Sequence, residues 1–405
     1  MSKQIFEGVN VIEIGEIAAA PYCGKLLADL GADVVKVEPP LIGDKARTRG
    51  PFLGDVPNSE QSALFLYANT NKRGVTLNFD TLSGKDILLR LLKNADVLIE
   101  DREPGELDIA GLGYEALRAM NPQLIMVSIT PFGQSGPYKN YKAYPLNTFH
   151  AGGEGYTLPG GLGYAKYPDR EPLKMAGYFG EYIAGLTAAI AAACALYGRD
   201  TIGSGQHVDI SKQEALMALS RVVLARYPNE GFVETRAVRE LPIGGLMPCK
   251  DGFAVVMAFE ARMWEGLVEI MGRPAWTQEE RYKNADSRVA LKKEVNGLII
   301  EWLKAHTKDE VYHQAQAHDC AVGPVYTIGE AIGSAQTRAQ GFMTDLQHPI
   351  VGKLEYPTAG YHFSRTPLLF KRPAPLLGQH NEEVYSRRLG ISKAEMVELR
   401  LAGVI

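Results

Sequence analysis

The 405-residue sequence is poor in cysteine and nearly balanced in charge, and both shortages exclude classes of protein. Its four cysteines lie far apart, with no C-x-x-C pair and no histidine at a metal-ligand spacing. We therefore expect free thiols in a reducing compartment and no metal site. The net charge of −4 provides no general attraction for nucleic acid or for an anionic membrane, so neither is an expected partner.

The sequence also lacks segments that direct a chain out of the cytosol. The first residues, MSKQIFEGVNVIEIG, have neither the apolar core nor the small-residue cleavage site of a signal peptide. The longest apolar run, residues 183–197, is shorter than the roughly 20 residues that cross a bilayer. We therefore expect a cytoplasmic protein.

The N-terminal segment predicts a strand, a helix and a second strand, but no nucleotide-binding motif accompanies them. β-type residues at 11–14 are followed by a helix near 21–30 and by a second apolar run at 32–38. The loop between them, GEIAAAP at 15–21, is not G-x-G-x-x-G, and the chain has no G-x-x-x-x-G-K-[ST] loop or G-x-S-x-G elbow. Dehydrogenases, NTPases and serine hydrolases are therefore disfavoured.

Alternating β and α segments continue through the first 130 residues, which indicates an α/β protein with a doubly wound parallel sheet. Continuous Val/Ile runs suit strands that are buried on both faces of such a sheet. A last strand is predicted at 204–211, after a Gly/Pro-rich loop and a long helix. The segments between are predicted strands at 74–78, 95–100 and 124–130 and predicted helices at 83–93 and 114–120.

A second, smaller α/β region follows the sheet. Residues 247–259 predict two strands that turn at Asp251-Gly252, with helices after them and a strand at 321–325. The domain prediction is a large Rossmann-like domain at 1–211 and 352–405, a small α/β domain at 244–327, and linkers at 212–243 and 328–351.

One acid stands at the start of an apolar helix. Residues 183–197 carry alanine and aliphatic side chains on every face, as expected for a helix that is buried all round. Glu181 precedes this run in the first turn, where the helix dipole and free N–H groups stabilise a carboxylate. Because acids are common in first turns, the position alone leaves a structural and a catalytic role open.

Several motifs together resemble the class III CoA-transferases, a family that also contains the alpha-methylacyl-CoA racemases. The resemblance runs through nearly the whole chain. The segments that carry it are AAAPYCGKLLADLGADVVKVEPP from residue 18, GD at 43–44, NKRGVTLNF at 71–79, GLGYEAL at 111–117, ITPFGQSGPY at 129–138, GEYIAGLTAA at 180–189 with GRDTIGSGQHVDIS after it, and PLLGQHNEEV at 375–384.

The resemblance implies that Glu181 is the nucleophile, because it occupies the acid position of the family pattern G-D-x-x-x-G-L-x-A. Its carboxylate would attack an acyl-CoA thioester and hold CoA as a glutamyl-CoA thioester until a carboxylic acid displaces it. The family acid is normally Asp, and the additional methylene of Glu moves the carboxylate by about 1.5 Å. The resemblance implies no permanently bound cofactor, because coenzyme A enters as the acyl-CoA substrate.

The same resemblance assigns the surroundings of the nucleophile. The backbone at Ile17 and Ala18 is expected to pass beside the thioester, and Gly244-Gly245 resemble a shortened glycine loop that covers the intermediate. The remaining CoA contacts and neighbours that it implies are Lys72, Arg73, Arg102, Lys142 and Tyr144, with Arg47 as a further cation.

Two alternatives stay open within this resemblance. An acyl-CoA racemase or isomerase of the same fold would need a base near Tyr144, and a catalytically silent CoA-binding protein would keep the fold without the reaction. The family forms interlocked dimers, which implies a homodimer here. The acids that are exchanged are not indicated by the sequence, and the candidates for their recognition are Tyr156, Tyr164, Tyr178 and Met247.

Overall fold

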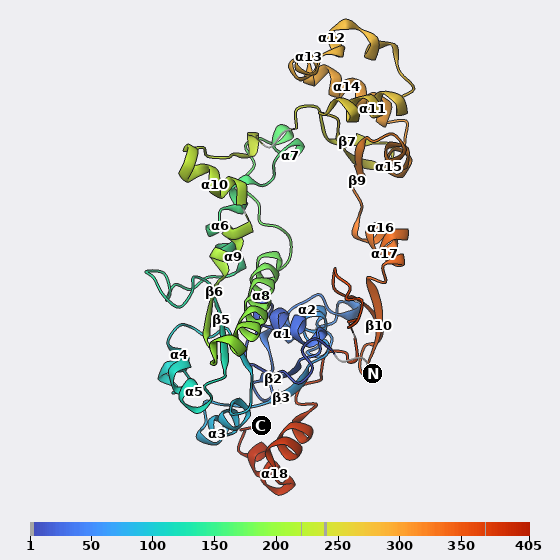
Figure 1. Ribbon diagram of the computed structural model, residues 1–405. Helices are drawn as coiled ribbons and strands as arrows, with labels where there is room; N and C mark the ends of the chain where they lie inside the picture. Colours follow the sequence, from blue (N-terminus) through green and yellow to red (C-terminus); the bar gives the residue numbers. More distant parts are fainter. Residues whose placement is uncertain (1–3, 220, 239–240, 369) are drawn as a thin grey trace. The chain divides into compact units, whose positions relative to one another are not determined.

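The computed structural model describes residues 4–219, 221–238, 241–368 and 370–405 (Figure 1). The chain divides into two compact units. The first comprises Met1–Glu154, Lys174–Leu224 and Arg338–Ile405, and the second comprises Gly155–Leu173 and Ala225–Thr337. The predicted small domain at 244–327 lies wholly within the second unit, whereas the predicted linkers are divided between the two units.

A six-stranded parallel sheet forms the centre of the first unit (Figure 1). The strand order is β3-β2-β1-β4-β5-β6, so the chain winds outward from β1 in one direction and then outward from β4 in the other. The prediction of a doubly wound parallel sheet is therefore confirmed. The strands are β1 Asn10–Glu13, β2 Asp33–Glu38, β3 Arg73–Thr76, β4 Val97–Glu100, β5 Ile125–Thr130 and β6 His207–Ser211.

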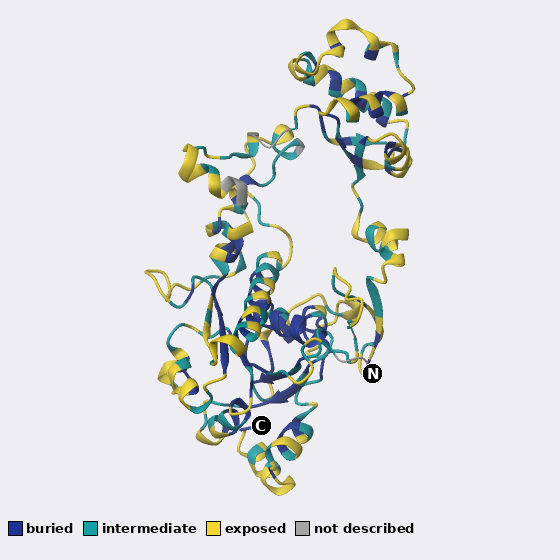
Figure 2. Ribbon diagram, viewed as in Figure 1, coloured by how far each residue is buried: buried dark blue, intermediate teal, exposed yellow. Residues whose placement is uncertain are grey.

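Helices cover both faces of this sheet, and the strands β1, β2 and β5 between them are buried (Figure 2). On one face, α1 Ala19–Asp29 and α8 Phe179–Ile202 pack against Val, Ile and Ala side chains of the strands. On the other face, α3 Leu82–Leu92 and α5 Tyr114–Met120 pack with the last residues of the chain. Because successive strand residues point to opposite faces, the continuous Val/Ile runs supply both layers.

Helix α8 extends beyond the apolar run at 183–197 at both ends, and only one side of it is buried. Alanines at 184, 188 and 192 belong to the core beside α1 and the sheet. The other side exposes Leu186 (42%), Ile190 (57%) and Tyr197 (87%). The expectation of a helix buried all round was therefore wrong for the single chain, because the helix lies in an outer layer. Among the described residues, α8 alone has the length and apolar composition of a membrane span, although its alanines pack in the core.

The Gly/Pro-rich segment at 131–174 contains short helices that its composition did not indicate. The first, α6 Pro145–Ala151, begins at a proline, whose fixed φ suits a first helical position. Asn147 Oδ1 accepts a hydrogen bond of 2.9 Å from the Tyr144 N–H. Phe149 of α6 is buried near Gly180 at the start of α8, so the helix closes one side of the region around Glu181.

The second unit is built on a three-stranded antiparallel sheet, β7 Gly244–Cys249, β8 Gly252–Met257 and β9 Ala321–Pro324. Cys249 pairs with Gly252, so the predicted turn lies one residue earlier, at 250–251. Met247 is buried in the core of this unit. The helices that pack in that core are α11 Ala261–Ile270, α14 Lys292–Leu303 and α15 Lys308–Ala317.

The remaining elements lie around these two cores. The hairpin of β10 Met343–His348 and β11 Gly352–Pro357 belongs to the first unit and begins in a stretch that was predicted as a linker. The other helices are α2 Ala63–Ala68, α4 Glu106–Ile109, α7 Leu162–Lys166, α9 Lys212–Leu219, α10 Arg221–Glu230, α12 Glu280–Lys283, α13 Ala285–Ala290, α16 Ile328–Gly333, α17 Ala335–Ala339 and α18 Lys393–Leu401.

Candidate active site

The segments that follow β1, β4, β5 and β6 surround a pocket of about 270 Å³ at one edge of the sheet. This edge holds the carboxyl ends of the strands, and the strand order reverses here between β1 and β4, which is the usual ligand position in such sheets. Ile17, Asp101, Tyr144, Glu181 and Lys212 are among the lining residues. The structure therefore brings the predicted Ile17, Tyr144 and Glu181 together.

Glu181 is a buried carboxylate that is held by one cation. It lies in the first turn of α8 with 4% of its surface exposed. Lys212 directly follows β6, and its Nζ lies 2.6 Å from Glu181 Oε2. Glu181 Oε1 makes no hydrogen bond or ion pair with any residue that the structure describes. One carboxylate oxygen is thus fixed, and the other is available for chemistry.

Two glycines determine how closely Glu181 approaches its neighbours. A Cβ atom at Gly180 would lie 3.3 Å from Leu216 of α9. A Cβ atom at Gly185 would lie 2.5 Å from the carbonyl oxygen of Ala19, where a real Cβ atom is essentially never found. The spacing G-E-x-x-x-G therefore lets the start of α8 pack against both α1 and α9.

The turn between β1 and α1 is held by two carboxylates. Ile17 has a positive φ of 66°, which is uncommon for a β-branched residue. Its N–H donates to Asp44 Oδ1 at 2.9 Å, and the Glu16 N–H donates to Asp101 Oδ2 at 2.9 Å. These two bonds fix the backbone that was expected to pass beside a thioester. Ala18 follows as the fully buried N-cap residue of α1.

The pKa values of the two carboxylates that hold this turn are shifted in opposite directions. Burial raises the pKa of Asp101 to about 6, although Lys212 opposes the rise. Burial alone would also raise the pKa of Asp44, but the Lys36 ammonium 2.7 Å from its Oδ2 and hydrogen bonds from backbone N–H groups lower it below its usual value. These contacts favour the ionised form of Asp44, which accepts the hydrogen bond from the Ile17 N–H.

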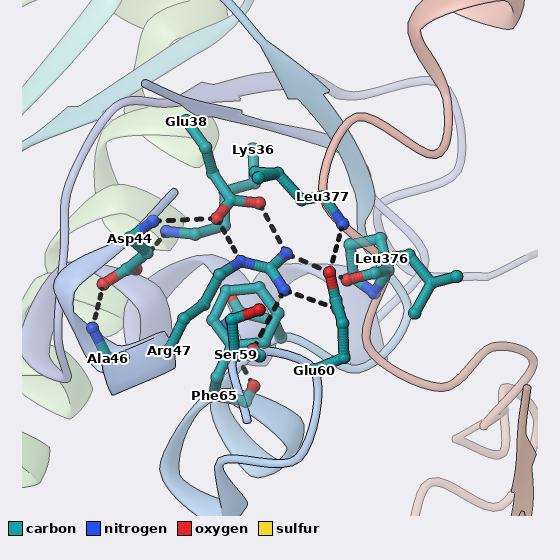
Figure 3. Close-up of polar contacts among 12 residues, drawn as sticks. Lys36, Glu38, Asp44, Ala46, Arg47, Ser59, Glu60, Phe65, Leu376 and Leu377 are labelled. Atoms are coloured by element: carbon teal, nitrogen blue, oxygen red, sulfur yellow. Dashed lines mark hydrogen bonds and ion pairs between the residues drawn. The ribbon is translucent and has the colours of Figure 1, made fainter. Parts of the chain in front are cut away.

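Arg47 lies at the centre of a buried charge network next to this turn (Figure 3). Its Nε and Nη2 donate to the two oxygens of Glu38 at 2.6 and 2.9 Å, and its Nη1 donates to Glu60 at 2.7 Å. The guanidinium also stacks over the ring of Phe65, 3.7 Å from the centroid. Arg47 is fully buried, so in this structure its charge pairs with carboxylates of the protein and stabilises the loop at 43–49.

Lys72, a predicted CoA contact, is also fully buried. Its Nζ lies 2.8 Å from Glu13 Oε2 and donates to the carbonyl oxygen of Pro21 at 2.7 Å and to Asn69 at 2.8 Å. Burial lowers the pKa of Lys72 to about 8, against the opposing effect of Glu13. All three ammonium donors are therefore occupied inside the protein, and a CoA contact by Lys72 stays a prediction.

Arg73 lies away from the pocket. It is the first residue of β3, and in a parallel sheet the first residues of the strands lie at the edge opposite their carboxyl ends. Its guanidinium pairs with Asp33, at the start of β2, and with Glu383 at 2.8 Å. The structure therefore does not bring Arg73 together with Glu181, and its predicted CoA contact has no support from this geometry.

Arg102 and Lys142 lie near one another in charge pairs outside the pocket lining. Arg102 pairs with Glu106 at 3.4 Å and stacks over Phe79, 5.0 Å from the ring centroid. Lys142 is exposed and lies 3.7 Å from Glu103. Because such exposed pairs are weak, Lys142 can exchange its partner for a phosphate at little cost.

Gly244 and Gly245 begin β7 in the second unit, and both have a positive φ. A Cβ atom at Gly244 would lie 2.1 Å from the carbonyl oxygen of Val256, so close strand pairing accounts for this glycine. No atom lies within 4 Å of a Cβ at Gly245. Their predicted role over the intermediate stays a prediction.

Two cations of the pocket, Lys212 and Arg49, were missed by sequence reasoning. Lys212 stands directly after the motif GSGQHVDIS, at the point where β6 ends, and this position could have indicated it. Arg49 comes two residues after Arg47 in the sequence GDKARTR and lines the pocket that also contains Glu181. The pairing of Lys212 with Glu181 and the place of Arg49 in the same pocket follow only from the fold, which brings these loops together.

A second pocket, of about 300 Å³, lies beside β4, β5 and β6 and contains a chain of polar groups. Glu100 is buried and hydrogen bonded to Ser128, and Ser128 Oγ lies 2.8 Å from His207 Nε2. Burial raises the pKa of Glu100 to about 7 and lowers the pKa of His207 below its usual value. This pocket adjoins the strand ends without including Glu181.

The described residues contain neither a candidate metal site nor a disulfide. No group of three or more His, Cys, Asp or Glu side chains in that part of the chain could hold a metal ion. All four cysteines are free thiols, and burial raises the pKa of Cys320 to about 11.

Comparisons with known proteins assign this chain to a family. A model of CoA-transferase family III matches residues 6–381. The chain is 30% identical to a succinyl-CoA–D-citramalate CoA-transferase of Chloroflexus aurantiacus over 98% of each chain, and 32% identical to a formyl-CoA:oxalate CoA-transferase of Streptomyces avermitilis over 100% of each. A CAIB/BAIF family protein from Brucella suis has a similar structure, with a TM-score of 0.85 and 30% identity over 96% of this chain and 100% of that chain. The chain belongs to CoA-transferase family III.

This membership confirms the class that the motifs predicted, a CoA-transferase whose substrates are linked to CoA. A third relative, 31% identical over 94% of this chain and 95% of its own, is the succinate–glutarate CoA-transferase of Agrobacterium fabrum. Because these relatives are named as transferases, the comparisons do not favour a racemase.

Proposed function

We propose that the protein transfers CoA between an acyl-CoA and a free carboxylic acid, and that Glu181 carries the CoA between them. The observation that supports this most directly is the buried Glu181 carboxylate in the pocket, with Oε2 held by Lys212 and Oε1 without a described partner. The chain belongs to family III, and an uncrowded carboxylate oxygen in the pocket can supply the nucleophile for such a covalent transfer.

The first half of the reaction moves CoA onto the protein. Glu181 Oε1 attacks the thioester carbonyl carbon, the C–S bond breaks, and CoA leaves as a thiolate while a mixed anhydride forms. The thiolate then attacks the Glu181 carbonyl carbon of the anhydride. This step forms a glutamyl-CoA thioester and releases the donor acid as a carboxylate, so no proton or electron is left over.

The second half reverses these steps with a different acid. The acceptor carboxylate attacks the glutamyl-CoA carbonyl carbon and expels the CoA thiolate, which gives a new mixed anhydride. The thiolate attacks the acyl carbon of the acceptor, and the Glu181 carboxylate is regenerated as the leaving group. Two moderate barriers replace one difficult exchange in each half.

Groups around Glu181 would stabilise the charges that develop in these steps. Lys212 remains beside Oε2 throughout and supports the carboxylate when it leaves. No side chain caps the N-terminus of α1, and we propose that the N–H groups of its first turn stabilise the oxyanion of the thioester. Asp44 and Asp101 hold the preceding turn, which keeps these donors in place without reorganisation.

Mass spectrometry of the covalent glutamyl-CoA intermediate tests this proposal. The protein is incubated with succinyl-CoA or oxalyl-CoA, digested, and searched for a CoA adduct on the peptide that contains Glu181, which hydroxylamine should remove. Glu181→Gln is the matched control and should form no adduct. An adduct at another residue, or full transfer activity in the Gln variant, would contradict the mechanism.

We also propose that the chain forms a homodimer. The support is the exposed apolar side of α8, where Leu186, Ile190 and Tyr197 lie at helical spacing on a face without a partner in the described part of the chain. Contiguous apolar patches of this kind mark interaction surfaces in soluble proteins.

A further inference from the structure

Arg49 stands out in the pocket because its charge is not used. Its guanidinium makes no hydrogen bond or ion pair with any residue that the structure describes, and Arg49 is exposed. Lys212, the other cation that lines the pocket, is committed to Glu181 at 2.6 Å. An arginine that lines the same pocket as a nucleophile and lacks a counter-charge is suited to bind an anionic group of the substrate.

The backbone at Arg49 is fixed although its side chain is free. The Arg49 N–H donates to the carbonyl oxygen of Ala46 at 3.0 Å, and the Arg49 carbonyl accepts from Ser62 Oγ at 2.6 Å. Two residues earlier, Arg47 is anchored by Glu38 and Glu60 in the buried network (Figure 3). The network therefore presents Arg49 from a rigid loop, so little order must be gained when a ligand binds.

The charges of the other lining residues leave no counter-ion for Arg49. Glu16 pairs with Lys45 at 2.6 Å, and Glu181 pairs with Lys212. Asp101 accepts from the Glu16 N–H, and burial raises its pKa to about 6. A monocarboxylic acid would use its single carboxylate at Glu181 and would leave Arg49 without a partner. A dicarboxylic acid would bring a second carboxylate, which matches the guanidinium in charge and in geometry.

We infer that Arg49 binds the distal carboxylate of a dicarboxylic acid, so that the acids exchanged at this site are short-chain dicarboxylates. The inference rests on the proposed function of Glu181. It adds a specificity residue to that site, and the pocket volume of about 270 Å³ restricts the acid to a small one. Arg49 contacts the far end of the acid, while Glu181 reacts at the near end.

Steady-state transfer assays with matched acids test the inference. Succinate and glutarate are compared with butyrate and valerate, which have the same chain lengths but one carboxylate. The wild-type protein should use the dicarboxylates with the lower KM. Arg49→Gln should raise the KM for the dicarboxylates by about 10- to 100-fold and should largely remove the preference over the monocarboxylates. Arg49→Lys should fall between the two.

The outcomes separate the ligands that an unpaired arginine could bind. If Arg49→Gln raises only the KM for acyl-CoA, equally with every acid, the residue binds a CoA phosphate and the inference is overturned. An unchanged KM for every substrate overturns it as well. Arg118→Gln, which removes an exposed arginine that pairs with Glu115 on α5, is the control and should behave as wild type.

Failure of the inference and failure of the proposed function give different results. The glutamyl-CoA adduct on Glu181 is measured in the same preparations. If the adduct forms but wild type does not prefer dicarboxylates, only the role of Arg49 is rejected. If no adduct forms in wild type with any donor that is turned over, the proposed function is rejected together with the inference that rests on it.

Discussion

Lys212 Nζ and Glu181 Oε2 lie 2.6 Å apart, and this ion pair joins the end of strand β6 to the start of helix α8. The two residues are 31 positions apart in the chain. The pair fixes one oxygen of the Glu181 carboxylate, so this long side chain is held in one position inside the pocket.

Loss of this pair should slow transfer. Lys212→Met leaves a buried carboxylate without a counter-charge, which is costly, and removes the group that supports Glu181 as a leaving group. We expect kcat to fall by about 10- to 100-fold, as for other hydrogen bonds to charged groups. Steady-state kinetics at saturating acyl-CoA measure the change. Lys212→Arg keeps the charge and should retain more activity, and equal losses in both variants would contradict this role.

Shortening the side chain at position 181 should slow the reaction. Glu181→Asp withdraws the carboxylate by about 1.5 Å from Lys212 and from the thioester. A displacement of this size can cost about 100-fold in rate. We expect an aspartyl-CoA adduct at position 181 that forms more slowly and to a smaller extent than the glutamyl-CoA adduct of wild type. Rapid-quench mass spectrometry measures its rate of formation. Activity equal to wild type would show that the pocket does not depend on the additional methylene.

The stability of the protein should depend on the protonation of Glu100. Burial raises the pKa of Glu100 to about 7, above the usual value of about 4.3 for an unfolded chain. The folded state therefore binds more protons between these values, and its free energy of unfolding falls as the pH rises through that window.

Glu100→Gln should remove this dependence, because the amide keeps hydrogen-bond partners but does not titrate. The free energy of unfolding of the variant, relative to that of wild type, should rise by about 2 kcal/mol from pH 5 to pH 8. Urea unfolding at each pH measures both free energies. The exposed Glu115→Gln, on the wall of the same pocket, should show no such gain. A constant difference between Glu100→Gln and wild type across this range would reject the prediction.

The apolar side of α8 should control the oligomeric state. Ile190→Lys places a charge in the middle of the exposed apolar stripe. If two copies of the chain bury this stripe, the variant should be a monomer where wild type is a dimer, as measured by light scattering after gel filtration. Asp200→Asn, on the last turn of the same helix, is the control. A wild-type protein that is monomeric at micromolar concentration would rule out the homodimer.

The sheet of the first unit was predictable because its strands obey local rules. Val and Ile runs mark strands that are buried on both faces, and the helix predicted at 114–120 has the same bounds in the structure. Helix α6 was not predictable in this way. It lies in a Gly/Pro-rich segment, and its packing of Phe149 near Gly180 stabilises it, which local composition does not reveal.

The site was predictable only where it is encoded in one segment. Glu181 stands in a continuous motif, whereas the pairing of Lys212 with Glu181 is recognised only in the structure, where the end of β6 lies beside the start of α8. Burial of the predicted cations has the same origin. Arg47 pairs with Glu38 at the end of β2, and Lys72 pairs with Glu13 at the end of β1. No spacing in the sequence predicts these pairs.

The contact between Gly185 and the carbonyl of Ala19 has a consequence for engineering of the enzyme. Residues 30–178 separate helices α1 and α8 in the chain, yet at Gly185 the two helices pack without room for a single additional carbon atom. A chimera that takes residues 172–211 from another family member must therefore take that member's α1 as well. The nucleophile and the turn at Ile17 are inherited together, as one exchangeable block.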